Sequence, residues 1–230
     1  MSDIQYLENR HDPGLYSKQP LVLVRGKAAR IWDADGREYI DCIGGHGVAN
    51  IGHANPAVAK AVTDQAQRLL VCPNGFYSDQ RARLLAELVR IAPSGLARAF
   101  LCNSGAEAVE AALKFARIST GRIKIVAAMR GFHGRTFGAL SATWRKRYRQ
   151  PFEPLVPGFQ FVPYNRLERV EQAVDEETAA VILEVVQGEG GVIPGDGEYL
   201  RGVQALCRER EAMFIVDEVQ TGFGRTGRMF

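Results

Sequence analysis

The sequence lacks several features that would place it in a specialised class of protein. It has no apolar run long enough to cross a bilayer, and its start, MSDIQYLENR, is acidic and polar where a secretory signal has a basic start and an apolar centre. Its four cysteines are far apart and form no CxxC pair, so neither a disulfide framework nor a metal site is predicted. We therefore expect a soluble cytoplasmic protein that does not bind a membrane.

Excess charge of one sign is also nearly absent. The 29 Lys and Arg residues against 26 Asp and Glu give a net charge of +3, which is too small to predict a nucleic-acid partner. Basic residues gather only in WRKRYRQ, residues 144–150. This run is either a solvated surface or a site that attracts an acidic partner protein.

What the chain does contain is the material for a large core. Of its 230 residues, 46% are hydrophobic, enough for one large domain with a small appendage. In the first fifty residues, ARIWDADGREYID predicts a β-hairpin closed by an Asp-Gly turn, and Asn55 with Pro56 predicts a helix that runs to about Leu70. Beyond these, short apolar runs alternate with amphipathic helices, which predicts an α/β fold with a mainly parallel sheet.

Four apolar runs of strand length are each followed by polar residues. RAFLC leads into NSGAEA, KIVAAM into RGFHGRT, AAVIL into EVVQGEGG, and MFIV into DEVQTGFGRTG. Ligands of parallel sheets bind at the carboxyl ends of the strands. Four such ends in succession predict one shared site.

The first of these ends has the pattern of an anion site. Ser104, Gly105 and Ala106 begin a predicted helix whose apolar face is Ala108, Ala111, Ala112, Phe115 and Ala116, and Ser104 with Glu107 forms a capping-box pattern. Free N–H groups at a helix start favour a phosphate. An ordinary capped helix would have the same pattern.

The second end places Phe132, His133 and Arg135 on a glycine-rich loop. Phe132 can lie against a planar ligand, and Arg135 can hold a carboxylate through two hydrogen bonds. The alternative is that Phe132 is a core residue and that Arg135 forms a surface ion pair.

The third and fourth ends supply carboxylates and amides. Glu184, Gln187 and Glu189 follow AAVIL, while Asp217, Glu218 and Gln220 follow MFIV. Because the strand before Asp217 is expected to be buried on both faces, its carboxylate needs a cationic or N–H partner. A structural arginine or the protonated ring nitrogen of a ligand would serve.

The segment GFGRTG, residues 222–227, matches the dinucleotide-binding pattern G-x-G-x-x-G. That pattern requires glycines directly after a strand and at the start of a helix. Here DEVQT intervenes and no helical pattern follows, so we do not expect a dinucleotide site.

The segments NSGAEA, GFHGRT, QGEGGV and DEVQTGFGRTG together resemble those of the class III (subgroup II) aminotransferases, from about Gln19 to Phe230. The resemblance implies the aspartate aminotransferase-like fold (fold type I), pyridoxal 5'-phosphate as cofactor, and a homodimer. Within the class, the chain resembles acetylornithine aminotransferases and their lysine-pathway relatives that use the acidic carrier protein LysW. Of these two, YIDCIGGHGVANIGHANPAV, AAMRGFHGRTFGALSATW and FVPYN favour the second. The implied reaction moves an ω-amino group between a carrier-bound or N-acylated diamine and 2-oxoglutarate, with glutamate as the other product, in lysine or arginine biosynthesis.

The resemblance also implies roles for individual residues. Ser104, Gly105 and Ala106 would bind the cofactor phosphate, Phe132 would stack on the ring, and Asp217 would pair with the ring nitrogen. Gln220 would reach the ring hydroxyl, Glu184 would support the pocket, and His133 belongs to the same cofactor-binding set. Arg135 would bind the α-carboxylate of the substrate, and Glu189 would change partner between the two substrates.

The same resemblance places the lysine that would carry the cofactor as a Schiff base beyond Phe230, so no catalytic residue is expected in this chain. It implies an N-terminal segment 1–50 that belongs to a smaller domain, and a large domain 51–230 that is incomplete at its C-terminal end. Three positions depart from the family pattern: Val185, Arg166 and Glu211, the last where a glycine usually follows the helix. An aminomutase or decarboxylase, or a non-catalytic cofactor-binding protein, are the alternatives.

Overall fold

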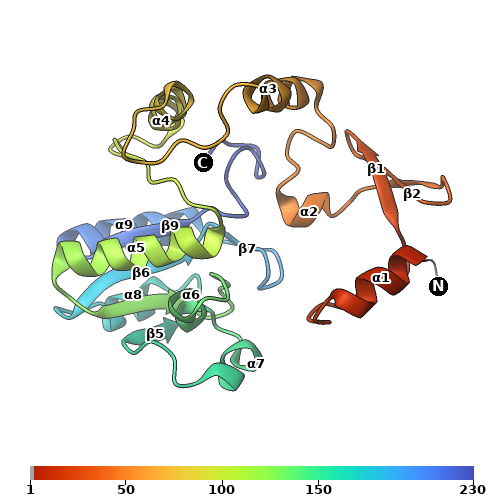
Figure 1. The fold of residues 1–230 in the computed structure, drawn as a ribbon. Helices are drawn as coiled ribbons and strands as arrows, with labels where there is room; N and C mark the ends of the chain where they lie inside the picture. Colours follow the sequence, from red (N-terminus) through yellow and green to blue (C-terminus); the bar gives the residue numbers. More distant parts are fainter. Residues whose placement is uncertain (1–2) are drawn as a thin grey trace. The chain divides into compact units, whose positions relative to one another are not determined.

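The computed structural model describes residues 3–230 and consists of two compact units, the first ending at Ala82 and the second running from Arg83 to Phe230 (Figure 1). Helix α4 (Asp79–Ile91) contains the boundary between them. The domain boundary expected at residue 50 stays a prediction, because a compact unit need not be a domain that folds alone.

The first unit contains a three-stranded antiparallel sheet of β1 (Leu23–Lys27), β2 (Arg30–Asp33) and β3 (Glu38–Ile40). The predicted hairpin is confirmed, since Trp32 pairs with Glu38 across its turn. The Asp33 side chain accepts hydrogen bonds from the backbone N–H groups of Asp35 and Arg37, at 3.0 and 2.8 Å. The Asp33 side chain therefore stabilises the turn, because its carboxylate accepts from two backbone N–H groups of the turn.

The helices of the first unit are α1 (Asp3–His11), α2 (Gly44–Gly47) and α3 (Pro56–Ala66). The Asn55 side chain caps α3, as predicted, by accepting hydrogen bonds from the N–H groups of Ala57 and Val58. The predicted end near Leu70 is wrong, because α3 ends at Ala66 and is followed by a turn in which Arg68 N–H and Leu69 N–H both donate to the Gln65 carbonyl.

The second unit is built on a four-stranded parallel sheet in the order β5 (Phe159–Val162), β4 (Lys124–Ala128), β6 (Thr178–Glu184) and β9 (Met213–Asp217). Every residue of β6 is buried, and so are the last four of β4. The predicted α/β class with a mainly parallel sheet is therefore confirmed.

Helices cover both faces of this sheet. Residues Ile125 and Ile182 face α5 (Gly105–Thr120) and α6 (Phe137–Ala142) in one core. Their neighbours Val126 and Val181 belong to a second core with α8 (Leu167–Ala173) and α9 (Gly197–Glu209). Figure 1 shows α5 in front of the sheet, with α8 and α9 behind it. This alternation follows from the two-residue period of a strand.

Shorter elements complete the second unit: α7 (Lys146–Arg149), the 3-10 helix η1 (Gln150–Phe152), and the two-stranded ribbon of β7 (Val186–Gln187) and β8 (Ile193–Pro194). None of the helices within residues 3–230 combines the length and apolar character needed to span a membrane.

Three sequence-based expectations are wrong in the second unit. RAFLC, residues 98–102, is not a strand, because no segment among residues 3–230 pairs with it; β5 is a strand that was not predicted. Strand β9 is not buried on both faces: Met213 and Val216 are 43% and 40% exposed, since β9 lies at the sheet edge. Of the apolar face predicted for α5, Ala116 is buried as expected, but Ala108 and Phe115 are exposed, because the buried face is centred on Val109 and Leu113.

Glu211, which stands where the family pattern has glycine, keeps the backbone conformation that glycine favours. Its φ is +54°, which costs an L-residue roughly 1 kcal/mol. The Arg122 guanidinium donates to the carbonyl oxygens of Arg210 at 2.8 Å and of Glu211 at 3.4 Å. A cationic side chain thus holds the last carbonyl groups after α9.

Candidate functional site

The candidate site lies where β4, β6 and β9 end. Glu184 and Asp217 are the last residues of β6 and β9, and they are register partners on adjacent parallel strands. Strand β4, on the other side of β6, leads into the loop Gly131–Thr136 that carries Phe132, His133 and Arg135. The sheet therefore brings together residues from three of the four predicted strand ends.

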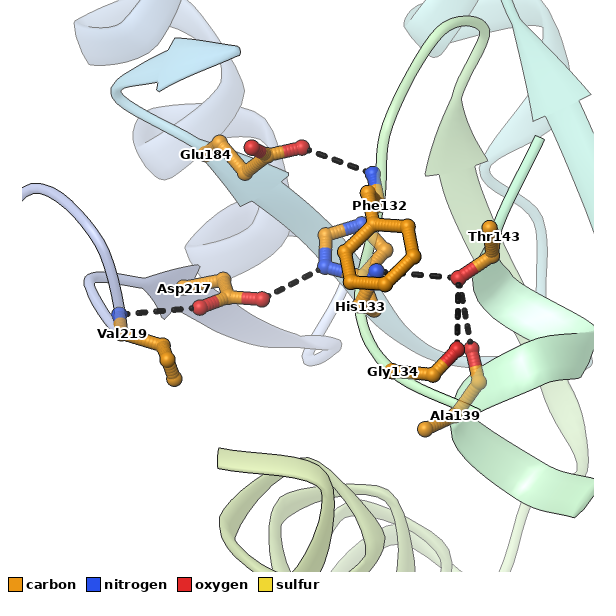
Figure 2. Close-up of polar contacts among 8 residues, drawn as sticks. All are labelled: Phe132, His133, Gly134, Ala139, Thr143, Glu184, Asp217 and Val219. Carbon is orange, nitrogen blue, oxygen red and sulfur yellow. Dashed lines mark hydrogen bonds and ion pairs between the residues drawn. The ribbon is translucent and has the colours of Figure 1, made fainter. Parts of the chain in front are cut away.

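At the centre of the site is a buried pair, His133 and Asp217. The His133 Nδ1 atom lies 2.7 Å from Asp217 Oδ2, and the two side chains are 0% and 6% exposed (Figure 2). The second carboxylate oxygen, Oδ1, accepts the backbone N–H of Val219 at 3.0 Å. His133 is therefore the side-chain partner of Asp217, and it donates to Oδ2 in the tautomer that carries its proton on Nδ1.

The loop that carries His133 is held by hydrogen bonds to its backbone. Glu184 Oε1 accepts the N–H of Phe132 at 2.9 Å, and Thr143 Oγ1 accepts the N–H of His133 at 2.9 Å (Figure 2). The Thr143 hydroxyl is also within 3.3 Å of the Gly134 carbonyl and 3.1 Å of the Ala139 carbonyl. Consecutive residues of the loop are thus fixed by different elements.

Burial of Glu184 alters its acidity. Removal of the carboxyl from water raises the pKa of Glu184 above its usual 4.5, and the neighbouring charge of Asp217 acts in the same direction. The hydrogen bond from Phe132 and the proximity of His133 oppose this shift. A buried carboxyl group whose pKa is shifted by burial and by a neighbouring charge is typical of functional sites.

The start of α5 has the predicted cap and touches the rest of the site. Ser104 Oγ accepts the N–H of Glu107 at 3.1 Å, while the Glu107 carboxylate accepts the N–H of Asn103 at 2.6 Å. A Cβ atom on Gly105 would lie 2.6 Å from a methyl group of Val219, the residue that binds Asp217. The helix N-terminus and the Asp217 segment are therefore in direct contact, and glycine permits this approach.

Two residues that support the site were not found from the sequence. Thr143 is fully buried, and Glu110 on α5 accepts hydrogen bonds from Thr136 Oγ1 at 2.6 Å and from the N–H groups of Gly138 and Ala139. Glu110 thereby caps the start of α6 and ties the His133 loop to α5. In the sequence, Glu110 is one glutamate among the alanines of a predicted helix, and a glutamate on the solvated face of any helix would have the same pattern.

Gln220 lies against Gly188. A Cβ atom on Gly188 would overlap the Gln220 side-chain oxygen, so the two segments can be this close only with glycine at position 188. The neighbouring Gln187 is fully buried and donates from Nε2 to the Met129 carbonyl at 2.9 Å. Gln187 thus ties β7 to the end of β4, which is a structural contact.

Arg135 and Glu189 lie at the exposed rim. Glu189 Oε1 accepts a hydrogen bond from the Tyr148 hydroxyl at 3.0 Å and lies 3.9 Å from Arg145 Nη1. Arg145 also donates to the Glu189 carbonyl at 3.3 Å. Two residues of the basic segment 144–150, Arg145 and Tyr148, thus contact Glu189, while Lys146 and Arg147 are exposed.

These residues fit a pyridoxal phosphate molecule. A ring nitrogen that must stay protonated needs an anionic acceptor, and Asp217 carries a buried carboxylate. Its Oδ1 accepts the N–H of Val219, and its Oδ2 faces His133 Nδ1, which donates in the tautomer with the proton on Nδ1. The start of α5 offers backbone N–H groups and the positive end of a helix dipole to a phosphate. Phe132 is half-buried on the loop that binds Glu184 and carries His133, so it can stack on a planar ring.

The sequence profile of the family Aminotransferase class-III matches residues 15–230, so the chain belongs to the class III aminotransferases. It is 52% identical to the [LysW]-aminoadipate semialdehyde transaminase of Deinococcus radiodurans, over 97% of this chain and 52% of that protein. It is 50% identical to the acetylornithine aminotransferase of Methanopyrus kandleri, over 99% of this chain and 59% of that protein. The chain thus spans little more than half the length of these curated relatives.

Solved structures agree with this assignment. The ornithine aminotransferase of Toxoplasma gondii superposes with a TM-score of 0.91 at 34% identity, over 99% of this chain and 55% of that one. The taurine:2-oxoglutarate aminotransferase of Bifidobacterium kashiwanohense, solved in complex with PLP and glutamate, gives a TM-score of 0.92 at 30% identity, over 99% and 57%. The expected fold of the family is therefore confirmed.

Proposed function

We propose that this chain forms the cofactor-binding part of a pyridoxal phosphate-dependent aminotransferase. The enzyme moves an ω-amino group between a carrier-bound or N-acylated diamine and 2-oxoglutarate, in lysine or arginine biosynthesis. The observation that carries this proposal is the buried His133–Asp217 pair, 2.7 Å apart and beside the start of α5. Support for the substrate class comes from the relatives named for LysW-aminoadipate semialdehyde and acetylornithine, whose sequences are 52% and 50% identical to this chain over the matched residues.

Each part of the cofactor has a residue of matching chemistry. Ser104, Gly105 and Ala106 at the start of α5 bind the phosphate, and Phe132 covers one face of the ring. Asp217, oriented by His133, binds the ring nitrogen and keeps its proton in place. When bound, pyridoxal phosphate supplies the electron sink that stabilises negative charge at the substrate carbon.

Other residues act around the cofactor and on the substrate. Glu184 holds the loop that carries Phe132, and Gln220 donates to the ring hydroxyl. Arg135 binds the carboxylate of glutamate or 2-oxoglutarate, because a guanidinium pairs with a carboxylate through two parallel hydrogen bonds. Glu189 distinguishes the two amino donors by its negative charge.

Cofactor binding can be tested on the 230-residue chain itself. Equilibrium dialysis with pyridoxal phosphate is expected to give one saturable site, weakened when Asp217 is changed to Asn. Activity is tested in a chimera in which the segment of the Deinococcus relative beyond the matched region follows Phe230. The chimera should form glutamate from 2-oxoglutarate and N-acetylornithine; saturable cofactor binding without amino transfer would identify a binding protein instead.

An acidic carrier protein is a proposed partner, and we expect it to bind at the basic segment 144–150. Arg145 contacts Glu189, and Arg147 donates to Tyr148 at 2.9 Å, so reversing either would disturb the site. Lys146 is exposed between them. In the chimera, Lys146→Glu should raise KM for a carrier-bound substrate and leave KM for N-acetylornithine unchanged; equal KM values for wild type and variant would remove the carrier role.

A further inference from the structure

The loop that carries Arg135 packs directly on the first turn of α5. A Cβ atom on Gly134 would lie 3.0 Å from the Cβ of Ala106 and 2.9 Å from that of Ala139, and the φ of Gly134 is +137°. A side chain at residue 134 would therefore push the loop away from α5. Ala106 belongs to the turn that binds the phosphate in the proposed function, so the residue before Arg135 contacts the proposed phosphate site.

The residue after Arg135 is held by α5 as well. Thr136 Oγ1 donates to Glu110 Oε1 at 2.6 Å, and the same carboxylate oxygen accepts two backbone N–H groups at the start of α6. Glu110 follows Ala106 by four residues, so the two lie on one face of α5. A single face of this helix therefore contacts the residues on both sides of Arg135.

The contact between Thr136 and Glu110 is of a strong kind. Hydrogen bonds to a charged oxygen are shorter and stronger than those between neutral groups, and an O–H donor 2.6 Å from a carboxylate falls in that range. Thr143 holds the earlier part of the loop, by accepting the N–H of His133 at 2.9 Å. Glu110 holds the later part, at Thr136.

We propose that Glu110 is a positioning residue for the substrate carboxylate. Because α5 is one continuous helix, its phosphate-binding turn and Glu110 keep a fixed separation. Glu110 transfers this fixed position through Thr136 to the backbone of Arg135, so that the cofactor phosphate and the substrate carboxylate are bound at a set distance. This inference rests on the proposed function.

The test compares two ligands that differ by one carboxylate. Phosphopyridoxyl-alanine and phosphopyridoxyl-ethylamine have the same phosphate, ring and methyl group, but the second has hydrogen in place of the α-carboxylate. Both contain a stable bond between cofactor and amine, so they need no lysine from the protein. Their dissociation constants are measured by calorimetry on the 230-residue chain. We expect the wild-type chain to bind the alanine compound roughly 10-fold more tightly, because Arg135 pairs with its carboxylate.

Thr136→Val removes the hydroxyl that Glu110 accepts and leaves the backbone N–H groups of α6 on the carboxylate. We expect it to weaken the alanine compound roughly 3- to 10-fold, the range of one hydrogen bond, and to leave the ethylamine compound within about 2-fold. Glu110→Ala keeps a strong helix former on α5 and should change the ratio of the two constants in the same direction. In that background, Thr136→Val should have no further effect on the ratio.

Thr120→Val is the matched control. Thr120 Oγ1 donates to the Ala116 carbonyl at 2.8 Å, so the same kind of hydroxyl is removed at the opposite end of the same helix. This variant should change neither constant. Because Thr136 is exposed, Thr136→Val should fold like the wild-type chain, which circular dichroism checks.

An unchanged ratio in Thr136→Val would overturn the positioning role while leaving the proposed function intact. Equal weakening of both compounds would also overturn it, since a general structural change affects both. An effect of Thr136→Val that persists in the Glu110→Ala background would remove Glu110 from the account. If the wild-type chain bound neither compound, the proposed function would fall together with this inference.

Discussion

The candidate site has two parts that are held in place differently: a buried floor of His133, Glu184 and Asp217, and an exposed rim of Arg135, Arg145 and Glu189. On the floor, the side chains of His133 and Asp217 are at most 6% exposed and contact each other. The His133 N–H donates to Thr143 Oγ1, and Asp217 Oδ1 accepts the N–H of Val219.

On the rim, the side chains of Arg145 and Glu189 are 42% and 47% exposed. Glu189 contacts Tyr148 on α7 and Arg145, the residue that precedes α7. Burial within the fold therefore fixes the floor, which in our account binds the same cofactor in every reaction. Exposed side-chain contacts hold the rim, which in our account binds different substrates.

The largest expected effect comes from the floor. Asp217→Asn keeps the shape of the side chain but removes its charge, so we expect pyridoxal phosphate to bind about 10- to 100-fold more weakly, the range for a hydrogen bond to a charged group. Equilibrium dialysis measures this change. Asp175→Asn is the control, because Asp175 is 52% exposed and pairs with Lys124 near the amino ends of the strands. Equal binding by both variants would show that the floor does not hold the ring nitrogen.

Gly188→Ala tests the contact between Gly188, which follows β6 in the chain, and Gln220, which follows β9. A Cβ atom at residue 188 would overlap the Gln220 side-chain oxygen, so Gln220 must move. We expect affinity for pyridoxal phosphate to fall roughly 5-fold, by the loss of about one hydrogen bond. Gly75→Ala, where a Cβ atom meets open space, should leave affinity unchanged. A wild-type constant in Gly188→Ala would argue against any role for Gln220 in cofactor binding.

The buried acid of the floor predicts a pH dependence of stability. Because burial raises the pKa of Glu184, the folded protein binds a proton more tightly than the unfolded chain, so its free energy of unfolding falls as pH rises above about 4.5. The fall is about 1.4 kcal/mol for each unit by which the pKa is raised.

Glu184→Gln should flatten this part of the profile, since a neutral amide can still accept the N–H of Phe132. Urea unfolding of both proteins between pH 4.5 and 7 measures the slopes. Parallel profiles would mean that Glu184 titrates as it does in water.

The smallest effect belongs to the rim. Glu189→Gln changes an exposed group, so we expect the free energy of unfolding to change by less than about 0.5 kcal/mol. Thermal unfolding followed by circular dichroism measures it. A loss above about 1 kcal/mol would contradict the distinction, because Glu189 would then be part of the fixed framework.

Local features of the site were predictable from the sequence. The Ser104 cap and the Asn55 cap depend on residues within four positions of one another, and the short spacing that identifies them also creates the contact. The polar ends after three of the strands followed from the shared direction of parallel strands. Only the first strand failed, because RAFLC has no hydrogen-bonding neighbour within residues 3–230.

Long-range partners could not be predicted. His133 and Asp217 are 84 residues apart, and their contact depends on the register of β4, β6 and β9. Tyr148 reaches Glu189 across 41 residues from a segment whose basic composition suggested only charge.

The most direct test of the central claim is the protonation state of the bound cofactor ring. Pyridoxal phosphate labelled with ¹⁵N in the ring is added to the 230-residue chain, and the nitrogen chemical shift is recorded at pH 8. Our account predicts a protonated ring nitrogen in the wild-type complex and an unprotonated one in Asp217→Asn. An unprotonated nitrogen in the wild-type complex would show that the buried carboxylate does not serve the cofactor.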